Sequence, residues 1–138
     1  MKLIISFLLL SVAASAALPS AVVLPLAEIN SRQSAWVKAN PSGSVYNMTS
    51  RADCGAGQSM RPLLQPCDRM LYEAYVGQKV KGSVVFVNVA WCKIPVTHLA
   101  YDETATHVFL TGINNRKSDG WIPKTQVKAV LVGVLIPE

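Results

Sequence analysis

One serine lies in a segment whose residue types could present it as a nucleophile. The segment Gly57 to Leu64 reads Gly-Gln-Ser-Met-Arg-Pro-Leu-Leu, with Ser59 two residues after a glycine and three before Pro62. Glycine lets the backbone bend sharply and approach a ligand closely, and proline fixes the direction in which the chain leaves the bend. A serine at such a bend can point its hydroxyl into a cleft, with Met60 packed underneath as an anchor. By itself, the pattern is also that of an ordinary turn.

Further segments along the chain extend this pattern. Together with Asp68, the serine segment resembles the nucleophile box of the signal peptidase I superfamily, which also includes self-cleaving repressors: Gly-x-Ser-Met-x-Pro-x-Leu, then Gly-Asp. The resemblance covers about Gly55 to Leu135, and its segments follow the family's order. The other segments that carry it are Val80 to Phe86, Val96 to Leu99, Leu110 to Asn115, Asp119 to Pro123, and Val130 to Val134.

The resemblance implies both a fold and an activity. The fold would be mainly β, with small coiled sheets or a partly open barrel of the signal peptidase and repressor peptidase type, and one short N-terminal helix. The activity would be that of a serine endopeptidase, which cleaves a polypeptide such as a pre-protein through an acyl-enzyme. The substrate would dock as an added strand at a sheet edge, and small side chains beside the cut site are implied by the family.

A serine hydroxyl is a poor nucleophile until a neighbouring base takes its proton. Bacterial housekeeping members of the family use a lysine, and the endoplasmic-reticulum and archaeal types use a histidine. The matching position here is His98, whereas Lys93 lies five residues upstream and does not fit the segment. A neutral imidazole acts as a base near neutral pH without the large pKa shift that a buried lysine needs. We therefore predict that Ser59 attacks and that His98 accepts and returns the proton.

A histidine base usually needs a carboxylate on its other ring nitrogen. The resemblance places Asp119 there. Asp102 is the second candidate, but four residues along a strand put it about 13 Å from His98. Asp119 is therefore the predicted orienting residue, although Ser118-Asp119-Gly120 is also a good turn sequence.

The oxyanion and loop positions depart from the family pattern. Signal peptidases usually have a serine where this chain has Gly57, so the oxyanion would rest on the Ser59 backbone N–H and on Gln58. Asp68 is predicted to support the loop after the nucleophile, and Cys67 replaces the glycine of the Gly-Asp pair. These changes leave an alternative function open: a catalytically degenerate, exported β module that binds a peptide or a secretion partner.

The N-terminus predicts export. A short positive region precedes the apolar run Leu3 to Val12 and the small residues Ala14-Ser15-Ala16. This pattern predicts a signal peptide over residues 1–16 and a periplasmic or secreted product. The alternative is an uncleaved membrane anchor over residues 3–27, facing outside the cytoplasm, although two prolines interrupt its second half.

Composition excludes several classes of protein. The chain has 138 residues, 51% of them hydrophobic and 15% charged, with a formal net charge of +5. That composition fits one folded domain and excludes a disordered chain. The basic residues are scattered, so no nucleic-acid partner is predicted, and the modest charge favours, at most, association with an anionic membrane surface. No cysteine and histidine spacing typical of a metal site occurs, and no metal or other cofactor is predicted.

Three cysteines allow at most one intrachain bridge. The two pairings that the spacing favours are Cys54–Cys67 and Cys67–Cys92.

The secondary-structure pattern is mainly β after an N-terminal region. Residues 17–50 are predicted to hold a helix over Ala27 to Lys38 and a linker, and residues 51–138 the peptidase-like β domain. The stretch Gly112 to Gly120 is predicted to be a loop. The predicted strands are Met70 to Val76, Ser83 to Trp91, Ile94 to Tyr101, Thr106 to Thr111, and Val127 to Ile136.

Overall fold

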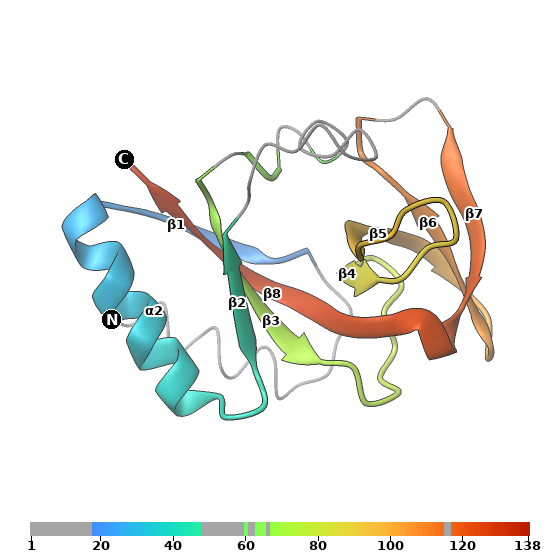
Figure 1. Ribbon diagram of the computed structural model, residues 1–138, viewed down its shortest axis with the longest axis horizontal. Coiled ribbons are helices and arrows are strands. Elements are labelled where there is room, and N and C mark those ends of the chain that lie inside the picture. Colours follow the sequence, from blue (N-terminus) through green and yellow to red (C-terminus); the bar gives the residue numbers. More distant parts are fainter. Residues whose placement is uncertain (1–17, 48–59, 61–62, 66, 115–116) are drawn as a thin grey trace.

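A computed structural model describes residues 18–47, 60, 63–65, 67–114 and 117–138 (Figure 1). Within these ranges, eight strands form one open, mostly antiparallel sheet in the order β2-β3-β8-β4-β5-β6-β7, and β1 pairs with β8 outside that path. The elements are β1 (Ser20–Leu24), α2 (Leu26–Ala39), β2 (Ser44–Asn47), β3 (Arg69–Ala74), β4 (Val84–Val87), β5 (Val96–Glu103), β6 (His107–Thr111), β7 (Ser118–Pro123), the 3-10 turn η2 (Lys124–Gln126) and β8 (Val127–Pro137).

The last strand, β8, organises the sheet. Its residues are mostly valine and leucine, and most of them are buried, as expected for a strand covered on both faces. One edge of β8 pairs antiparallel with β3. The other edge pairs with β4 along residues 127–131 and then in parallel with β1 along residues 133–137. This one strand therefore joins the N-terminal elements to the rest of the sheet.

The sheet is strongly curled. The hydroxyl groups of Tyr72 in β3 and Thr97 in β5 lie 2.6 Å apart, although β8 and β4 separate the two strands. In a flat sheet, strands three positions apart would lie about 14 Å from each other. Tyr72 is fully buried, and its burial raises the pKa of its hydroxyl, against the lowering effect of the hydrogen bond to Thr97. The curl brings β3 and β5 around the same core.

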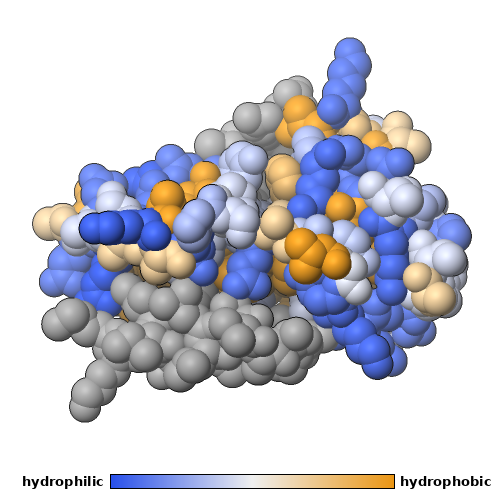
Figure 2. Space-filling model, turned by 90° about the horizontal axis from the view of Figure 1, so that it is seen from below, coloured by the Kyte–Doolittle hydropathy of each residue, from blue (hydrophilic) through white to orange (hydrophobic). Residues whose placement is uncertain are grey.

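Apolar side chains form separate clusters on the two faces of this curled sheet. One cluster lies between β4, β5, β6 and the first half of β8 and includes Val85, Ala100 and Leu110. A second cluster includes Met60, Tyr72 and Leu131. On the surface, hydrophobic residues on the face drawn in Figure 2 lie in small groups among hydrophilic ones.

The N-terminal elements belong to the same sheet. Helix α2 packs on it through Ile29 and Trp36, which are both buried, and β1 and β2 pair with β8 and β3. The alternative anchor, residues 3–27, lies mostly outside the described residues, and its last part holds the strand at Ser20–Leu24. The predicted signal peptide, residues 1–16, lies outside the described residues. Among those that are described, no helix has both the length and the apolar character needed to cross a bilayer.

The prediction of a mainly β chain with one N-terminal helix is confirmed. Helix α2 matches the predicted helix to within one residue at each end, and the five predicted strands correspond to β3, β4, β5, β6 and β8. The predicted loop over Gly112 to Gly120 is wrong at its C-terminal end, because β7 begins at Ser118. The strand predicted over Ser83 to Trp91 is shorter in the structure, since β4 ends at Val87.

Both favoured disulfide pairings are also wrong. Cys67 is exposed and carries a free thiol, and each of the two pairings required it. Cys54 lies outside the described residues.

Gly43 tests how tightly α2 is packed against the sheet. A Cβ atom at this position would lie 2.7 Å from Cζ3 of Trp36 and 3.0 Å from the carbonyl oxygen of Tyr72. Because both neighbours are buried, we expect Gly43→Ala to lower the free energy of unfolding by about 2–3 kcal/mol, as overpacking does. Urea denaturation measures this change.

Gly77→Ala is the control for Gly43→Ala. Gly77 has φ +96° and open space around it, so this substitution adds only backbone strain, about 1 kcal/mol. A Gly43→Ala variant no less stable than Gly77→Ala would contradict the tight contact with Trp36.

Candidate functional site

His98 is the third residue of β5 and, counted with its backbone, is 3% exposed. It pairs with Val85 of the neighbouring strand β4. Side chains alternate along a strand, so His98 shares its face with Val96 and Ala100, which both pack in the first cluster. The imidazole is therefore held among apolar side chains.

Asp119 reaches the same face from β7. Asp119 has no partner residue in the register with β6. Leu110 pairs with Gly120 and Thr111 with Ser118, so Asp119 is the extra residue of a β-bulge. Gly120 has φ +83°, a left-handed conformation that glycine adopts at little cost. Regular alternation would turn Asp119 away from the face that carries His98, and the bulge re-aims it.

A hydrogen bond joins Nδ1 of His98 to Oδ2 of Asp119. The two side chains are only 4% and 7% exposed. Strand β6 lies between β5 and β7, so the contact spans two strand spacings. The pairing of Leu99 with Thr111 places the buried Gly112 next in line, opposite His98. A residue without a side chain at that point leaves room for the two groups to meet above β6.

This arrangement fixes the chemistry of the imidazole. A carboxylate oxygen only accepts hydrogen bonds, so Nδ1 of His98 must donate, and the basic lone pair of the neutral ring then lies on Nε2. Asp119 also stabilises the imidazolium that forms when Nε2 takes a proton. The pair can therefore serve as a general base and then as a general acid.

The predicted nucleophile, Ser59, and the predicted oxyanion residue, Gln58, lie outside the described residues. Met60 is described and is 1% exposed. It packs in the second cluster, against which Leu99, the neighbour of His98, is also packed. The residue after the predicted nucleophile and the neighbour of the predicted base thus pack in the same cluster.

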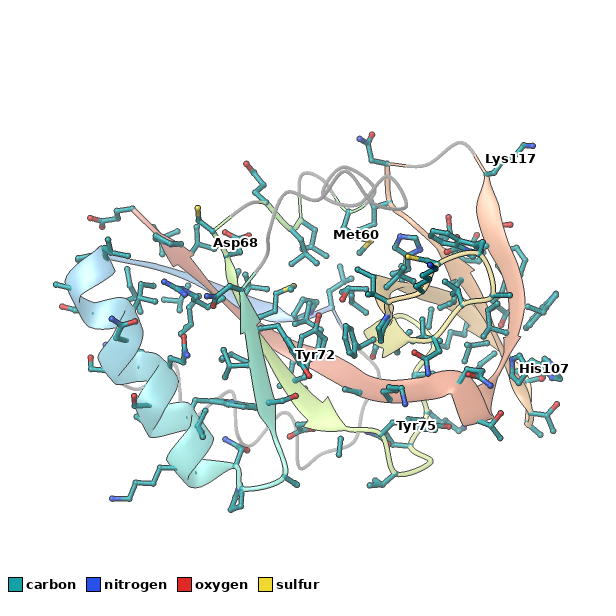
Figure 3. All side chains as sticks on the ribbon, in the orientation of Figure 1. Met60, Asp68, Tyr72, Tyr75, His107 and Lys117 are labelled. Carbon is teal, nitrogen blue, oxygen red and sulfur yellow. The ribbon has the colours of Figure 1, made fainter. Side chains whose placement is uncertain are left out.

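Asp68 holds the turn that leads into β3. It is buried, and its Oδ2 accepts a hydrogen bond from the backbone N–H of Gln65 at 2.9 Å. Burial raises the pKa of this carboxyl, and the hydrogen bond from Gln65 opposes that rise. Met60, Asp68 and Lys117, the residue before β7, lie along the same upper side of the molecule in Figure 3.

The other candidates from the sequence lie elsewhere. Asp102 is half-exposed and lies 3.5 Å from Nζ of Lys81, which places it in a surface ion pair rather than beside His98. Lys93 is exposed. The second histidine of the chain, His107, was not a candidate, and its ring nitrogen Nδ1 lies 2.8 Å from the hydroxyl of Thr106 on the surface. Among the described residues, no group of His, Cys, Asp and Glu could hold a metal ion.

Sequence reasoning missed one residue beside the pair, Trp91. Its ring lies 6.3 Å from the imidazole of His98, measured between centroids, with 32° between the ring planes. The sequence placed Trp91 at the end of a continuous strand, but the strand ends four residues earlier. The lysine two residues later and Pro95 were the available signals for a loop here.

Comparison with known proteins gave no match: no family model, no curated protein and no solved structure resembles the chain significantly.

Removal of Asp119 tests the buried pair. Asp119→Ala leaves Nδ1 of His98 buried without its carboxylate, so we expect the free energy of unfolding to fall by about 1–3 kcal/mol. Asp102→Ala is the control, because it removes a half-exposed carboxylate that pairs with Lys81 and accepts a hydrogen bond from the backbone N–H of Glu103, and it should cost no more than about 1 kcal/mol. Equal losses in the two variants, measured by urea denaturation, would contradict the buried hydrogen bond.

Cys67 gives a test of the loop beside Asp68. It has φ +76°, the only non-glycine residue with a positive φ in the described part of the chain. A glycine avoids the steric cost of this conformation, about 1–2 kcal/mol, and loses part of that gain through greater chain entropy on unfolding. We therefore expect Cys67→Gly to raise the free energy of unfolding by roughly 1 kcal/mol, which appears as a higher thermal midpoint. Cys67→Ala should leave the midpoint nearly unchanged. A destabilised Cys67→Gly variant would argue against the left-handed backbone.

Proposed function

We propose that this chain is an exported serine endopeptidase of the signal peptidase I type, with Ser59 as the nucleophile, His98 as the base and Asp119 as the orienting residue. The observation that carries the proposal is the buried hydrogen bond between His98 and Asp119. It supplies, from two strands that are not neighbours, the base and carboxylate that such an enzyme needs. Under this proposal, the curled open sheet corresponds to the signal peptidase fold.

The reaction follows from the roles of the three groups. Nε2 of His98 takes the proton of the Ser59 hydroxyl as its oxygen attacks the scissile carbonyl. The imidazolium, paired with Asp119, then gives that proton to the leaving amine, which departs as the acyl-enzyme forms. Water attacks the ester in the second half, with His98 again accepting a proton and returning it to Ser59. No cofactor takes part.

The position of Met60 supports the assignment of the nucleophile. Its side chain is buried in the cluster against which Leu99 of β5 also packs. This places the residue after Ser59 in the part of the core that the neighbour of His98 also contacts. Gln58 and the Ser59 backbone N–H are the proposed oxyanion donors.

The substrate of the proposed enzyme is an extended polypeptide, such as a pre-protein. An open sheet offers unpaired backbone groups at its edges, where a peptide can add as a further strand. Export to the periplasm or the exterior remains part of the proposal. A contact of the exported protein with a membrane surface is not needed for the proposed cleavage.

A serine-directed fluorophosphonate probe tests the proposal directly. We expect stoichiometric labelling at Ser59 in the wild type, none in Ser59→Ala, and a labelling rate about 10²- to 10⁴-fold lower in His98→Ala, because general-base catalysis is lost. Mass spectrometry of the labelled peptide identifies the site, and cleavage of pre-protein substrates should follow the same order. His107→Ala is the control and should be labelled like the wild type.

Two results would count against the enzyme. Equal cleavage by the wild type and Ser59→Ala would remove Ser59 from the mechanism. A folded wild-type protein that the probe leaves unlabelled would favour the alternative function, an exported β module that binds a peptide without cleaving it.

A further inference from the structure

Trp91 lies beside the buried pair without being part of the core. It sits in the connection between β4 and β5, with its ring 6.3 Å from the imidazole of His98 and inclined to it by 32°. Its side chain is 48% exposed, whereas that of His98 is 4% exposed. Trp91 belongs neither to the two clusters described above nor to the third, which Ile29 and Trp36 of α2 form with Leu24, Leu71 and Leu135. Its contact with His98 therefore needs an explanation other than core packing.

The connection around Trp91 is held in place on both sides. Val89 is buried in the first cluster, and Cys92 packs against the same cluster. Before them, the backbone N–H of Asn88 donates to the carbonyl of Gln126 at 3.0 Å. With these neighbours anchored, the indole of Trp91 is presented at the imidazole by a defined backbone.

We propose that Trp91 is a positioning residue for His98: its indole covers the imidazole and keeps water from the hydrogen bond to Asp119. Exclusion of water strengthens a hydrogen bond to a carboxylate, because the local dielectric is low. A stronger hydrogen bond to Asp119 holds the imidazole ring in one orientation. The contribution to catalysis rests on the proposed peptidase function, whereas the shielding of the pair does not.

The groups around His98 make this shielding simple to test. From β7, Asp119 faces the imidazole. From β4, the facing residue is Val85, and on the other side it is Gly112, the residue directly after β6; neither of them titrates. The connection that carries Trp91 also carries Lys93, which is exposed.

The test is the exchange of the Nδ1 proton of His98 with water, followed by proton NMR on protein with ¹⁵N-labelled histidine. The chain has two histidines, so His107→Ala assigns the resonance. We expect the wild type to show a resolved low-field Nδ1 proton. Trp91→Ala should speed its exchange by about tenfold or more as water reaches the pair, and Trp91→Phe should restore slow exchange.

Trp121→Ala is the matched control. Trp121 is also 48% exposed, but its ring packs against Phe109, with the centroids 5.2 Å apart. Loss of a half-exposed indole at that position should leave the His98 proton unchanged. Thermal midpoints of all variants show whether any effect comes from general destabilisation.

Three results would overturn the inference. They are unchanged exchange in Trp91→Ala, equal acceleration in Trp121→Ala, and a wild-type proton that already exchanges as fast as in Trp91→Ala. These exchange measurements do not require an active enzyme. If the fluorophosphonate probe leaves the protein unlabelled, the proposed function is contradicted, and the shielding by Trp91 is still tested by the exchange rates. In a protein that is labelled, the rate at Ser59 should fall in Trp91→Ala and be retained in Trp91→Phe, and an unchanged rate would remove the positioning role.

Discussion

The contact between His98 and Asp119 depends on a local irregularity in β7. The two residues stand on strands separated by β6, about 10 Å apart in a regular sheet. A regular β7 would also turn Asp119 toward the opposite face. The bulge at Asp119, made possible by the positive φ of Gly120, turns the side chain of Asp119 toward His98. The buried Gly112 leaves room for the two side chains to span the distance between the strands. The candidate site thus requires a particular backbone and not only a pair of suitable side chains.

Stability alone is a weak reason for such a pair. Burial of a carboxylate and an imidazole costs solvation energy that their mutual attraction only partly returns, and apolar side chains of similar size often stabilise a fold better. The buried residues of the surrounding cluster are valine, alanine and leucine. Groups that are costly to bury and specifically paired concentrate at functional sites. This comparison favours a chemical role for His98 and Asp119.

The sequence could predict most strands and the identity of the pair, but not the geometry that joins it. Alternating or β-branched runs indicated β3, β5, β6 and β8. Ser118-Asp119-Gly120 was predicted to belong to a loop, since the residues of a turn and of a bulge are the same: glycine supplies a positive φ in both. Only the pairing of Gly120 and the residues after it with β6 distinguishes the bulge from a turn. Strand β1 was missed because its apolar residues continue a run that is typical of a signal peptide.

The two faces of β5 divide the candidate site into two parts. Thr97 and Leu99 face the cluster that holds Tyr72 and Met60, and His98 faces the other. The side that anchors the residue after Ser59 and the side that carries the base are therefore opposite faces of one strand. Because β5 is paired with β4 on one side and β6 on the other, a nucleophile that serves His98 must reach it around the end of β5 rather than through the sheet. Asp119, Trp91 and Gly112 already surround the imidazole from β7, the β4–β5 connection and the end of β6. The proposed assignment of Ser59 therefore requires its hydroxyl to reach Nε2 of His98 from a segment whose next residue, Met60, packs in the other cluster.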